Sequence, residues 1–398
     1  MPTLTDLPQE LVYYIGELTV EDEDSPNPTC AVLALTHPVF VPFARGELFP
    51  DIVVSSQADL RALATLAKVA PAIISSVQTV EIDLSQGKEQ AVKEEEEQAL
   101  RALLKGLNRL QDFSTINSPR AADLVLSEPV ASKLRNLNEF NLVDAFLPNV
   151  NSFRPSRFKH LFQLPYLDYL EIIARPNPPF HHLASLPFPV PPSSSLCSGT
   201  LNVEGRLENA ASYLVASFAS LHGLAVDDME PSPSRKRSIL PSVLRHVISP
   251  QDLVFLALSQ ESGHRQQTLY DSLATFENLE ELHLSGNAFE EPMLAYAASL
   301  PKLTILVFGE GAWVAPGSIL ALVEGPHRPP ALQQLYLDHV RAKEDVYGHG
   351  DIVWPGDYTY DVVRRILDAA RSAGVEIEGK LAEFAREEGL IWTRRMGG

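Results

Sequence analysis

A spaced pattern of leucines recurs along the chain and restricts the folds open to it. Its clearest copy is "LEELHLSGNAF", in which Leu279, Leu282 and Leu284 are followed by Asn287 and Phe289. Alternate side chains of a short strand point to one side, and an asparagine at the next turn can satisfy backbone groups left unpaired by the bend. Weaker copies with the same apolar spacing begin at Val77, Leu137, Leu167, Leu221, Leu253, Leu303 and Leu332, with degenerate copies around Phe113 and Leu201.

The spacing of these copies indicates an internal repeat. From Val80 to Leu335, the central apolar residues lie 33, 27, 30, 31, 23, 32, 26, 24 and 29 residues apart. These intervals are close to the upper end of the roughly 20 to 29 residue period of leucine-rich repeats. A further strand, "GVEIEG" with Val375 and Ile377, is expected to close the array.

Segments between the predicted strands have helical periodicity. In "EEEEQALRALLKGL" the leucines at 100, 103, 104 and 107 lie on one face of a predicted helix. A second predicted helix, "DVVRRILDAARSAG", ends at Gly374, and glycine is typical of a helix C-terminus. A strand followed by a helix, repeated, stacks into a horseshoe with strands on the concave face and helices outside. The predicted fold class is therefore α/β, a leucine-rich-repeat solenoid.

Three segments interrupt this alternation. The segment 175–199 is rich in proline, which excludes a helix and predicts an extended loop. The segment 227–242 is polar with scattered prolines and is expected to be a mobile loop, and 339–360 is a third insertion rich in aromatic residues.

Charge and cysteine content exclude several classes of partner. The net charge is -19, so the surface repels the phosphates of nucleic acids and anionic lipids. The basic run Arg235-Lys236-Arg237 lies among serines and prolines, and it fits a nuclear-import or phosphorylation-controlled patch less well than a solvated loop. Cys30 and Cys197 are too few for a disulfide framework or a metal site. With no apolar run long enough for a membrane span, we expect a cytoplasmic or nuclear protein.

The first fifty residues do not follow the repeated leucine spacing. Pro8 suits the first position of a helix in which Leu11, Val12, Ile15 and Leu18 share one face. An acidic, proline-rich loop at 19–28 must interrupt this helix, and a second apolar stretch follows, broken into two short helices by His37-Pro38. Three short helices in about fifty residues form a marginal core. This segment is therefore expected to gain stability by packing against the neighbouring segment or against a partner protein.

This segment resembles the F-box. Leu7-Pro8-x-Glu10-Leu11-x-x-x-Ile15-x-x-x-Leu18 follows the first-helix signature of that family, and Cys30, Leu33, Leu35, Phe40, Ala44, Arg45 and Leu48-Phe49 follow the remainder. The whole chain is similar to the F-box and leucine-rich-repeat proteins that are numerous in mushroom-forming fungi. The resemblance implies an F-box at 1–54 and a repeat domain at 55–398.

The resemblance also implies a non-catalytic role as substrate receptor of a ubiquitin ligase of the Skp, cullin and F-box type. The F-box would dock on the Skp adaptor, and through it on a cullin, while the repeats hold a target protein. The adaptor-binding residues it implies are Leu7, Pro8, Leu11, Val12, Ile15, Leu18, Leu33, Leu35 and Phe40. The alternative is a repeat scaffold outside ubiquitination, whose degenerate F-box caps the open end of the solenoid.

Residues between the core positions of each strand face the concave surface and are candidates for target binding. They are Tyr169, Glu171, Phe255, Glu281, His283, Ile305, Tyr336 and Asp338. Their aromatic and acidic character suits a partner with a basic, partly apolar surface. The aromatic insertion adds Tyr347, Trp354 and Tyr358, because exposed aromatic residues are common interface anchors. The alternative is that Trp354 and Tyr360 fold back over the last repeat.

The sequence contains no recognisable catalytic or cofactor motif. There is no phosphate-binding glycine loop, HExxH, GxSxG or cluster of Cys and His, so we predict neither an enzyme nor a cofactor or metal. The pair His181-His182 lies in the proline-rich loop without further ligands. A third interpretation is a catalytic or metal loop built on His349, Asp351 and Asp357, but nothing in their spacing requires it.

Overall fold

The chain is an α/β protein built on parallel strands, and its contacts divide it into two compact units, 1–174 and 175–398. The computed structural model describes residues 27–83, 94–116, 134–143, 166–174, 198–205, 218–228, 240–260, 268–273, 275–286, 292–309, 314–325, 328–338 and 358–387, with shorter pieces at 8, 11–12, 14–16, 121, 124–125, 130, 161, 164, 212, 214–216, 238 and 311–312. The division falls inside the segment that the sequence assigns to a single repeat domain, 55–398.

The strands of unit 1 follow one another in chain order, each parallel to the next. They are β1 (Asp51–Val54), β2 (Thr79–Asp83), β3 (Asp112–Ile116), β4 (Glu139–Val143) and β5 (Tyr169–Ala174). The predicted strand cores at 80, 113, 140 and 170 are confirmed as β2 to β5. Strand β1 was not predicted: it pairs with β2, although its residues lie at the end of the segment assigned to the F-box.

The strands of unit 2 repeat the same arrangement. They are β6 (Ser198–Gly205), β7 (Ser220–Asp228), β8 (Phe255–Gln260), β9 (Glu281–Gly286), β10 (Ile305–Phe308), β11 (Gln334–Leu337) and β12 (Glu376–Glu378). Each is parallel to the next, and the one register shift in the described strands lies at Gly199/Thr200. Every remaining predicted strand, including "GVEIEG", is thus confirmed.

Alternation of buried and half-exposed side chains explains why the leucine pattern forms strands. In β2, β3, β8 and β9 buried residues alternate with partly exposed ones, and the buried ones are the residues of the repeated apolar pattern, apart from the polar Thr115 and Gln260. Side chains at equivalent positions stack from strand to strand, as shown by the parallel rings of Phe113 and Phe140, with centroids 5.7 Å apart. In each unit the core is therefore made of rows of equivalent residues on one face of the strands.

The turn before each strand makes the same backbone contact in successive copies. The N–H groups of Gln78 and Thr79 both donate to the carbonyl of Pro50. The N–H groups of Gln111 and Asp112 donate in the same way to Gln78 O, and the pattern continues to Asn138 O in unit 1 and from Val254 O to Thr304 O in unit 2. These shared acceptors satisfy backbone groups at the bend and fix the register of each strand on its neighbour.

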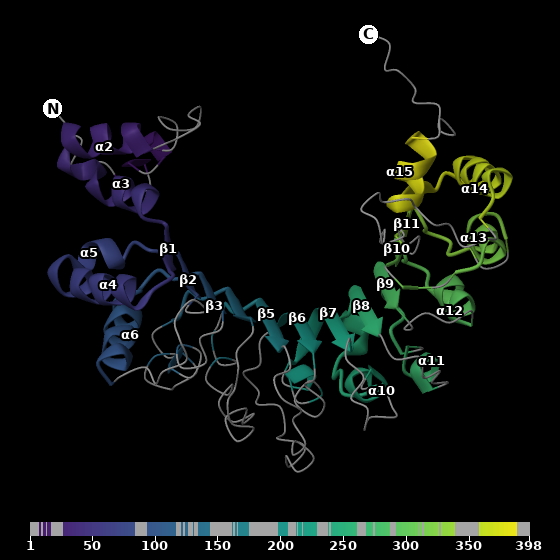
Figure 1. Ribbon diagram of the computed structural model, residues 1–398, viewed down its shortest axis with the longest axis horizontal. Helices are drawn as coiled ribbons and strands as arrows, with labels where there is room; N and C mark the ends of the chain where they lie inside the picture. The colour runs from purple at the N-terminus through teal and green to yellow at the C-terminus, as the bar shows by residue number, and fades with distance from the viewer. Residues whose placement is uncertain are drawn as a thin grey trace, which may run out of the picture. The chain divides into compact units, whose positions relative to one another are not determined.

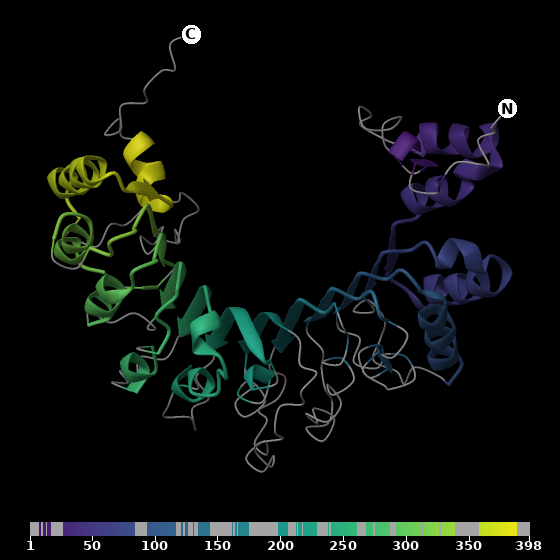
Figure 2. The same cartoon turned by 180° about the vertical axis from the view of Figure 1, so that it is seen from behind.

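Helices connect the strands in both units. In unit 1 the helices α4 (Gln57–Val69), α5 (Pro71–Ile74) and α6 (Glu94–Gly106) lie together on one side of β1 to β3 (Figures 1 and 2). In unit 2 the connecting helices are α10 (Leu240–Leu244), α11 (Thr268–Leu273), α12 (Met293–Ser299), α13 (Pro316–Val323), α14 (Tyr360–Ala373) and α15 (Lys380–Glu387), with a short 3-10 turn η7 at Pro250–Asp252.

The two helices predicted from periodicity are confirmed. Helix α6 buries its leucines at 100, 103 and 104. Helix α14 is capped at its start by Thr359, whose hydroxyl accepts from Val362 N, and at its end by Gly374, which has a φ of 71°. That left-handed conformation favours glycine and closes the helix with hydrogen bonds to Ala370 O and Arg371 O.

The N-terminal segment contains α2 (Asn27–Thr36), a 3-10 turn η2 (Pro38–Phe40) and α3 (Val41–Leu48), with helical backbone also at 11–12 and 14–16. The predicted break at His37-Pro38 is confirmed: α2 ends there, and His37 Nδ1 accepts from Val39 N. Cys30, Phe43 and Ala44 form a small buried cluster. A Cβ built on Gly16 would lie 2.6 Å from the Phe43 ring, so the first helix approaches α3 closely at this glycine.

The predicted loop at 227–242 is wrong at both ends. Asp227 and Asp228 belong to β7, and α10 begins at Leu240 because Leu240, Val243 and Leu244 are buried. Pro241 fits the start of a helix and does not interrupt it. The loops predicted at 175–199 and 339–360 lie outside the described residues apart from their last residues, Ser198 and Gly199 in β6 and 358–360 at the start of α14.

Candidate functional site

The N-terminal helices combine a buried cluster with exposed apolar side chains. Of the residues implied in adaptor binding, Pro8 is exposed, Leu11 is 48% exposed, Ile15 is also exposed, and Leu35 is 87% exposed. Leu33 packs partly against the cluster. Val12 and Phe40 are 2% and 6% exposed, so they belong to the core of this segment and cannot be direct contacts as placed. Leu7 and Leu18 lie outside the described residues.

Two further exposed apolar residues in these helices were missed by the sequence analysis. Tyr14 is exposed beside Ile15, and Val32 is exposed in α2, three residues before Leu35. The helical spacing of Val32 and Leu35 is a signal from which this face of α2 could have been found. The exposed apolar set of the N-terminal segment is thus Leu11, Tyr14, Ile15, Val32 and Leu35.

Exposed and half-exposed residues form rows across the strands of unit 1. The register aligns Asp51, Thr79, Asp112, Glu139 and Tyr169 in one row, and Val53, Glu81, Ser114, Asn141 and Glu171 in the next. The two predicted target-binding residues here are in contact, because the Tyr169 hydroxyl donates to Glu171 Oε1 over 3.3 Å. The prediction did not include Asp112, whose copy of the repeat is degenerate, or Glu139, although Glu139 holds the same position in its copy as Glu281, which was included.

The acidic residues in these rows perturb one another. Burial raises the pKa of Asp112, a hydrogen bond with Thr79 lowers it, and the charge of Asp51 raises it further. Burial also raises the pKa of Glu139, followed by the charges of Asp112, Asp168 and Glu171. All the charged neighbours that contribute to these two shifts are carboxylates, so this face has a concentrated negative field.

We expect this crowding to make stability depend on pH in a defined direction. A carboxyl group with a raised pKa in the folded state binds protons more readily there, so the free energy of unfolding falls as pH rises through its titration range. The variant Asp112→Asn with Glu139→Gln should therefore melt at a higher temperature than the wild type at pH 7.

The melting difference should vanish below about pH 3, where both carboxyls are protonated in folded and unfolded chains. Thermal unfolding followed by circular dichroism between pH 3 and 8 measures this. A double variant that is less stable than the wild type at pH 7 would contradict the repulsion inferred here. The variant Glu277→Gln with Glu280→Gln, in an exposed turn of unit 2, removes the same charge elsewhere and is the control.

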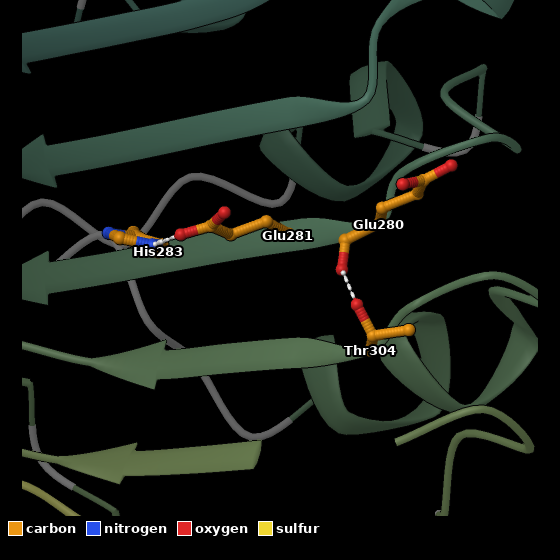
Figure 3. A network of polar contacts seen from close by, with 4 residues as sticks. All are labelled: Glu280, Glu281, His283 and Thr304. Carbon is orange, nitrogen blue, oxygen red and sulfur yellow. Dashed lines mark hydrogen bonds and ion pairs between the residues drawn. The ribbon is translucent and has the colours of Figure 1, made fainter. Parts of the chain in front are cut away.

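In unit 2 the predicted target-binding residues Phe255, Glu281 and His283 lie together. The His283 ring contacts the Phe255 ring edge-on, with centroids 5.1 Å apart, and His283 Nε2 lies 2.5 Å from Glu281 Oε1 (Figure 3). Beside them, the Thr304 hydroxyl donates to the carbonyl of Glu280 and fixes the next turn (Figure 3). Ile305 is the register partner of Glu281 on β10 and is half-buried.

Tyr336 and Asp338 lie next to β12. A hydrogen bond with Glu378 is the main cause that raises the pKa of Tyr336, and the charges of Glu378, Glu376 and Glu281 add to it. Asp338 Oδ1 accepts from the backbone N–H of Lys380 over 3.0 Å at the start of α15. Asp338, which directly follows β11, therefore has a local role in holding α15.

Tyr358 was predicted to be an exposed interface anchor, and this prediction is wrong. It is 4% exposed, and its hydroxyl donates to Val314 O over 2.8 Å. The tyrosine covers the chain before α13, and Tyr360, two residues later, is the exposed one. Tyr347, Trp354, His349, Asp351, Asp357 and the pair His181-His182 lie outside the described residues.

The described residues contain no candidate metal centre. No three His, Cys, Asp or Glu side chains among them are placed to hold an ion. Cys30 is buried in the N-terminal cluster, and Cys197 is outside the described part of the chain. In the same part of the chain, no helix has both the length and the apolar composition needed to cross a membrane.

Comparisons with known proteins give no family assignment. No protein-family model matches the chain, and no curated protein matches it significantly. Among solved structures, a protein from Bacteroides fragilis determined by structural genomics matches with a TM-score of 0.36 and 9% identity, over 83% of this chain and 74% of that one.

Proposed function

We propose that the protein is a non-catalytic substrate receptor of a ubiquitin ligase of the Skp, cullin and F-box type. In this proposal the N-terminal helices are an F-box that docks on a Skp-family adaptor, the two units form a leucine-rich-repeat solenoid, and its strand faces bind a target protein. The chain-order parallel strands and the repeated turn contacts support the solenoid.

The observation that carries the proposal is the split between buried and exposed apolar residues in the N-terminal segment. Val12, Phe40 and Phe43 are buried, whereas Leu11, Ile15 and Leu35 remain exposed. A fully buried aliphatic side chain contributes roughly 1.5 to 3 kcal/mol, so several of them left at the surface favour a partner. A segment that only capped the sheet would be expected to turn these side chains inward.

Co-expression with a Skp-family adaptor tests the proposal. We expect the two chains to elute together in size-exclusion chromatography at low micromolar concentration, and the adaptor to bring a cullin into the complex. Separate elution at all concentrations would favour the alternative, a repeat scaffold with a degenerate F-box as its N-terminal cap. In the proposed role, the protein would work in the cytoplasm or nucleus.

A further inference from the structure

The half-exposed face of the unit 1 sheet concentrates negative charge. Besides Asp83, its carboxylates are Asp51, Glu81, Asp112, Glu139 and Glu171, and we call these five the acidic rows. Strands β1 to β5 contain no Lys, Arg or His. The opposite face packs the apolar core under α4 to α6 (Figure 1), so the charges are confined to the other side.

The acidic rows are unfavourable for the chain by itself. Asp112 and Glu139 are direct register partners on neighbouring strands, which lie about 4.8 Å apart in a sheet. Like charges directly opposite each other destabilise a sheet. Burial is the largest cause of the raised pKa of both carboxyls, the charge of Asp51 adds to the pKa of Asp112, and the charge of Asp112 adds to the pKa of Glu139. The geometry therefore concentrates a charge that a cationic partner would neutralise.

A second observation on the same face is a side-chain oxygen that lacks a hydrogen-bond partner. Asn141 lies between Ser114 and Glu171 in the second row, and its Oδ1 atom is buried without a hydrogen-bond partner. A buried acceptor left unpaired costs roughly 1 to 3 kcal/mol. An N–H group of an incoming chain would satisfy it after a side-chain rotation. Val53 and Tyr169 add an apolar and an aromatic surface to the ends of the rows.

Other occupants fit this face less well. A metal ion needs several ligands around one point, and no such group occurs among the described residues. Nucleic acid would be repelled by the carboxylates. An extended polypeptide places every second side chain on one side at intervals of about 6.6 to 6.8 Å, a spacing that lets successive cations reach carboxylates on neighbouring strands.

We propose that the acidic rows bind an extended protein segment with lysine or arginine at alternate positions, and that such a segment is the feature by which this chain recognises its target. The inference rests on the proposed role as a substrate receptor, because it names the chemistry of the target. Lysine or arginine side chains pair with Asp112, Glu139 and Glu81, and the Asn141 amide pairs with the backbone of the segment.

The test uses the full chain and a fluorescein-labelled ten-residue peptide of alternating lysine and threonine, followed by fluorescence anisotropy. We expect binding that weakens with added NaCl, since exposed charges are screened. The same peptide with glutamate in place of lysine should not bind. The variant Asp112→Asn with Glu139→Gln should bind the lysine peptide at least fivefold more weakly than the wild type.

A matched variant separates the acidic rows from the overall charge of -19. Glu277→Gln with Glu280→Gln changes the net charge equally but lies in a turn of unit 2, and it should bind like the wild type. Equal weakening in both variants would overturn the proposal, because the peptide would then respond only to general charge. Unchanged binding in Asp112→Asn with Glu139→Gln would overturn it too, provided that its circular dichroism shows a folded chain.

Adaptor binding in the same preparations distinguishes this inference from the proposed function. A chain that binds the adaptor but not the lysine peptide would remove only the acidic-row proposal. A chain that binds the peptide through the rows but no adaptor would remove the ligase role and leave a binding surface for basic segments.

Discussion

Leu11→Asp is expected to weaken binding of the Skp-family adaptor by about 100-fold or more. Leu11 is 48% exposed in the chain alone, so the folded protein tolerates a polar group there. In the complex, an aspartate at this position loses the apolar contact and also buries a carboxylate without a partner. A 100-fold loss corresponds to roughly 2.7 kcal/mol, which these two effects together supply. Isothermal titration calorimetry with purified adaptor measures it.

Val69→Asp is the matched control for this prediction. Val69 is an apolar residue at the end of α4, 78% exposed, and lies outside the N-terminal helices. It receives the same new charge, and we expect adaptor affinity within about twofold of the wild type because exposed surface substitutions have small effects. If Leu11→Asp bound as tightly as Val69→Asp, the adaptor would have to use another surface, and the N-terminal assignment would be withdrawn.

Phe140→Ala is expected to destabilise unit 1 by about 3 to 5 kcal/mol, the range typical of a buried aromatic residue. Phe140 is 0% exposed and stacks on Phe113 of the neighbouring strand. Its removal leaves a cavity between successive copies that the main chain cannot close, because β4 is held in register by β3 and β5. Urea unfolding measured by circular dichroism gives the loss in the free energy of unfolding.

Hydrogen exchange shows where the effect of Phe140→Ala is located. We expect faster exchange in β3 to β5 and little change in β9 to β11, which belong to the other unit. Phe49→Ala, at an exposed phenylalanine of the same unit, should cost less than about 1 kcal/mol. A loss below about 1 kcal/mol for Phe140→Ala would show that the aromatic stack is not part of the unit 1 core.

The strands could be predicted from the sequence because the spacing of apolar residues in each copy is typical of a strand with one buried face. An apolar-x-x-apolar-x-apolar segment fills a sheet core only as a strand in the register seen here, and every predicted copy from Val80 to Ile377 forms one. The same spacing also occurs at β1, as Phe49-x-x-Ile52-x-Val54, so this strand was missed although its residues follow the pattern. Its pairing with β2 aligns Ile52 with Val80 and Val54 with Ile82, which are the core positions of the next copy.

The exposure of individual side chains could not be predicted to the same degree. Tyr358 looks like an exposed aromatic residue in its local sequence, but its partner, Val314, is 44 residues earlier in the chain. In the first helix, Leu11 and Val12 have the same apolar character, and packing within the folded segment leaves one exposed and buries the other. Helical spacing defines a broad face, whereas burial is decided by the residues packed against it.

The acidic rows were missed for a related reason. The sequence identifies Asp112 and Glu139 as polar residues before strand cores, but only the register makes them neighbours. Residues 27 apart in the sequence become opposite each other because two turns share the same backbone geometry.

The shared carbonyl acceptors before the strands also bear on how such a chain can change over evolutionary time. Alignment between adjacent copies is specified by main-chain atoms in a short bend, as at Pro50, Gln78 and Gln111. The connecting stretches can therefore gain or lose residues while the paired positions stay in line. Intervals as different as 23 and 33 residues are compatible with this main-chain alignment. Additional residues can therefore be inserted between copies without changing the order of the strands.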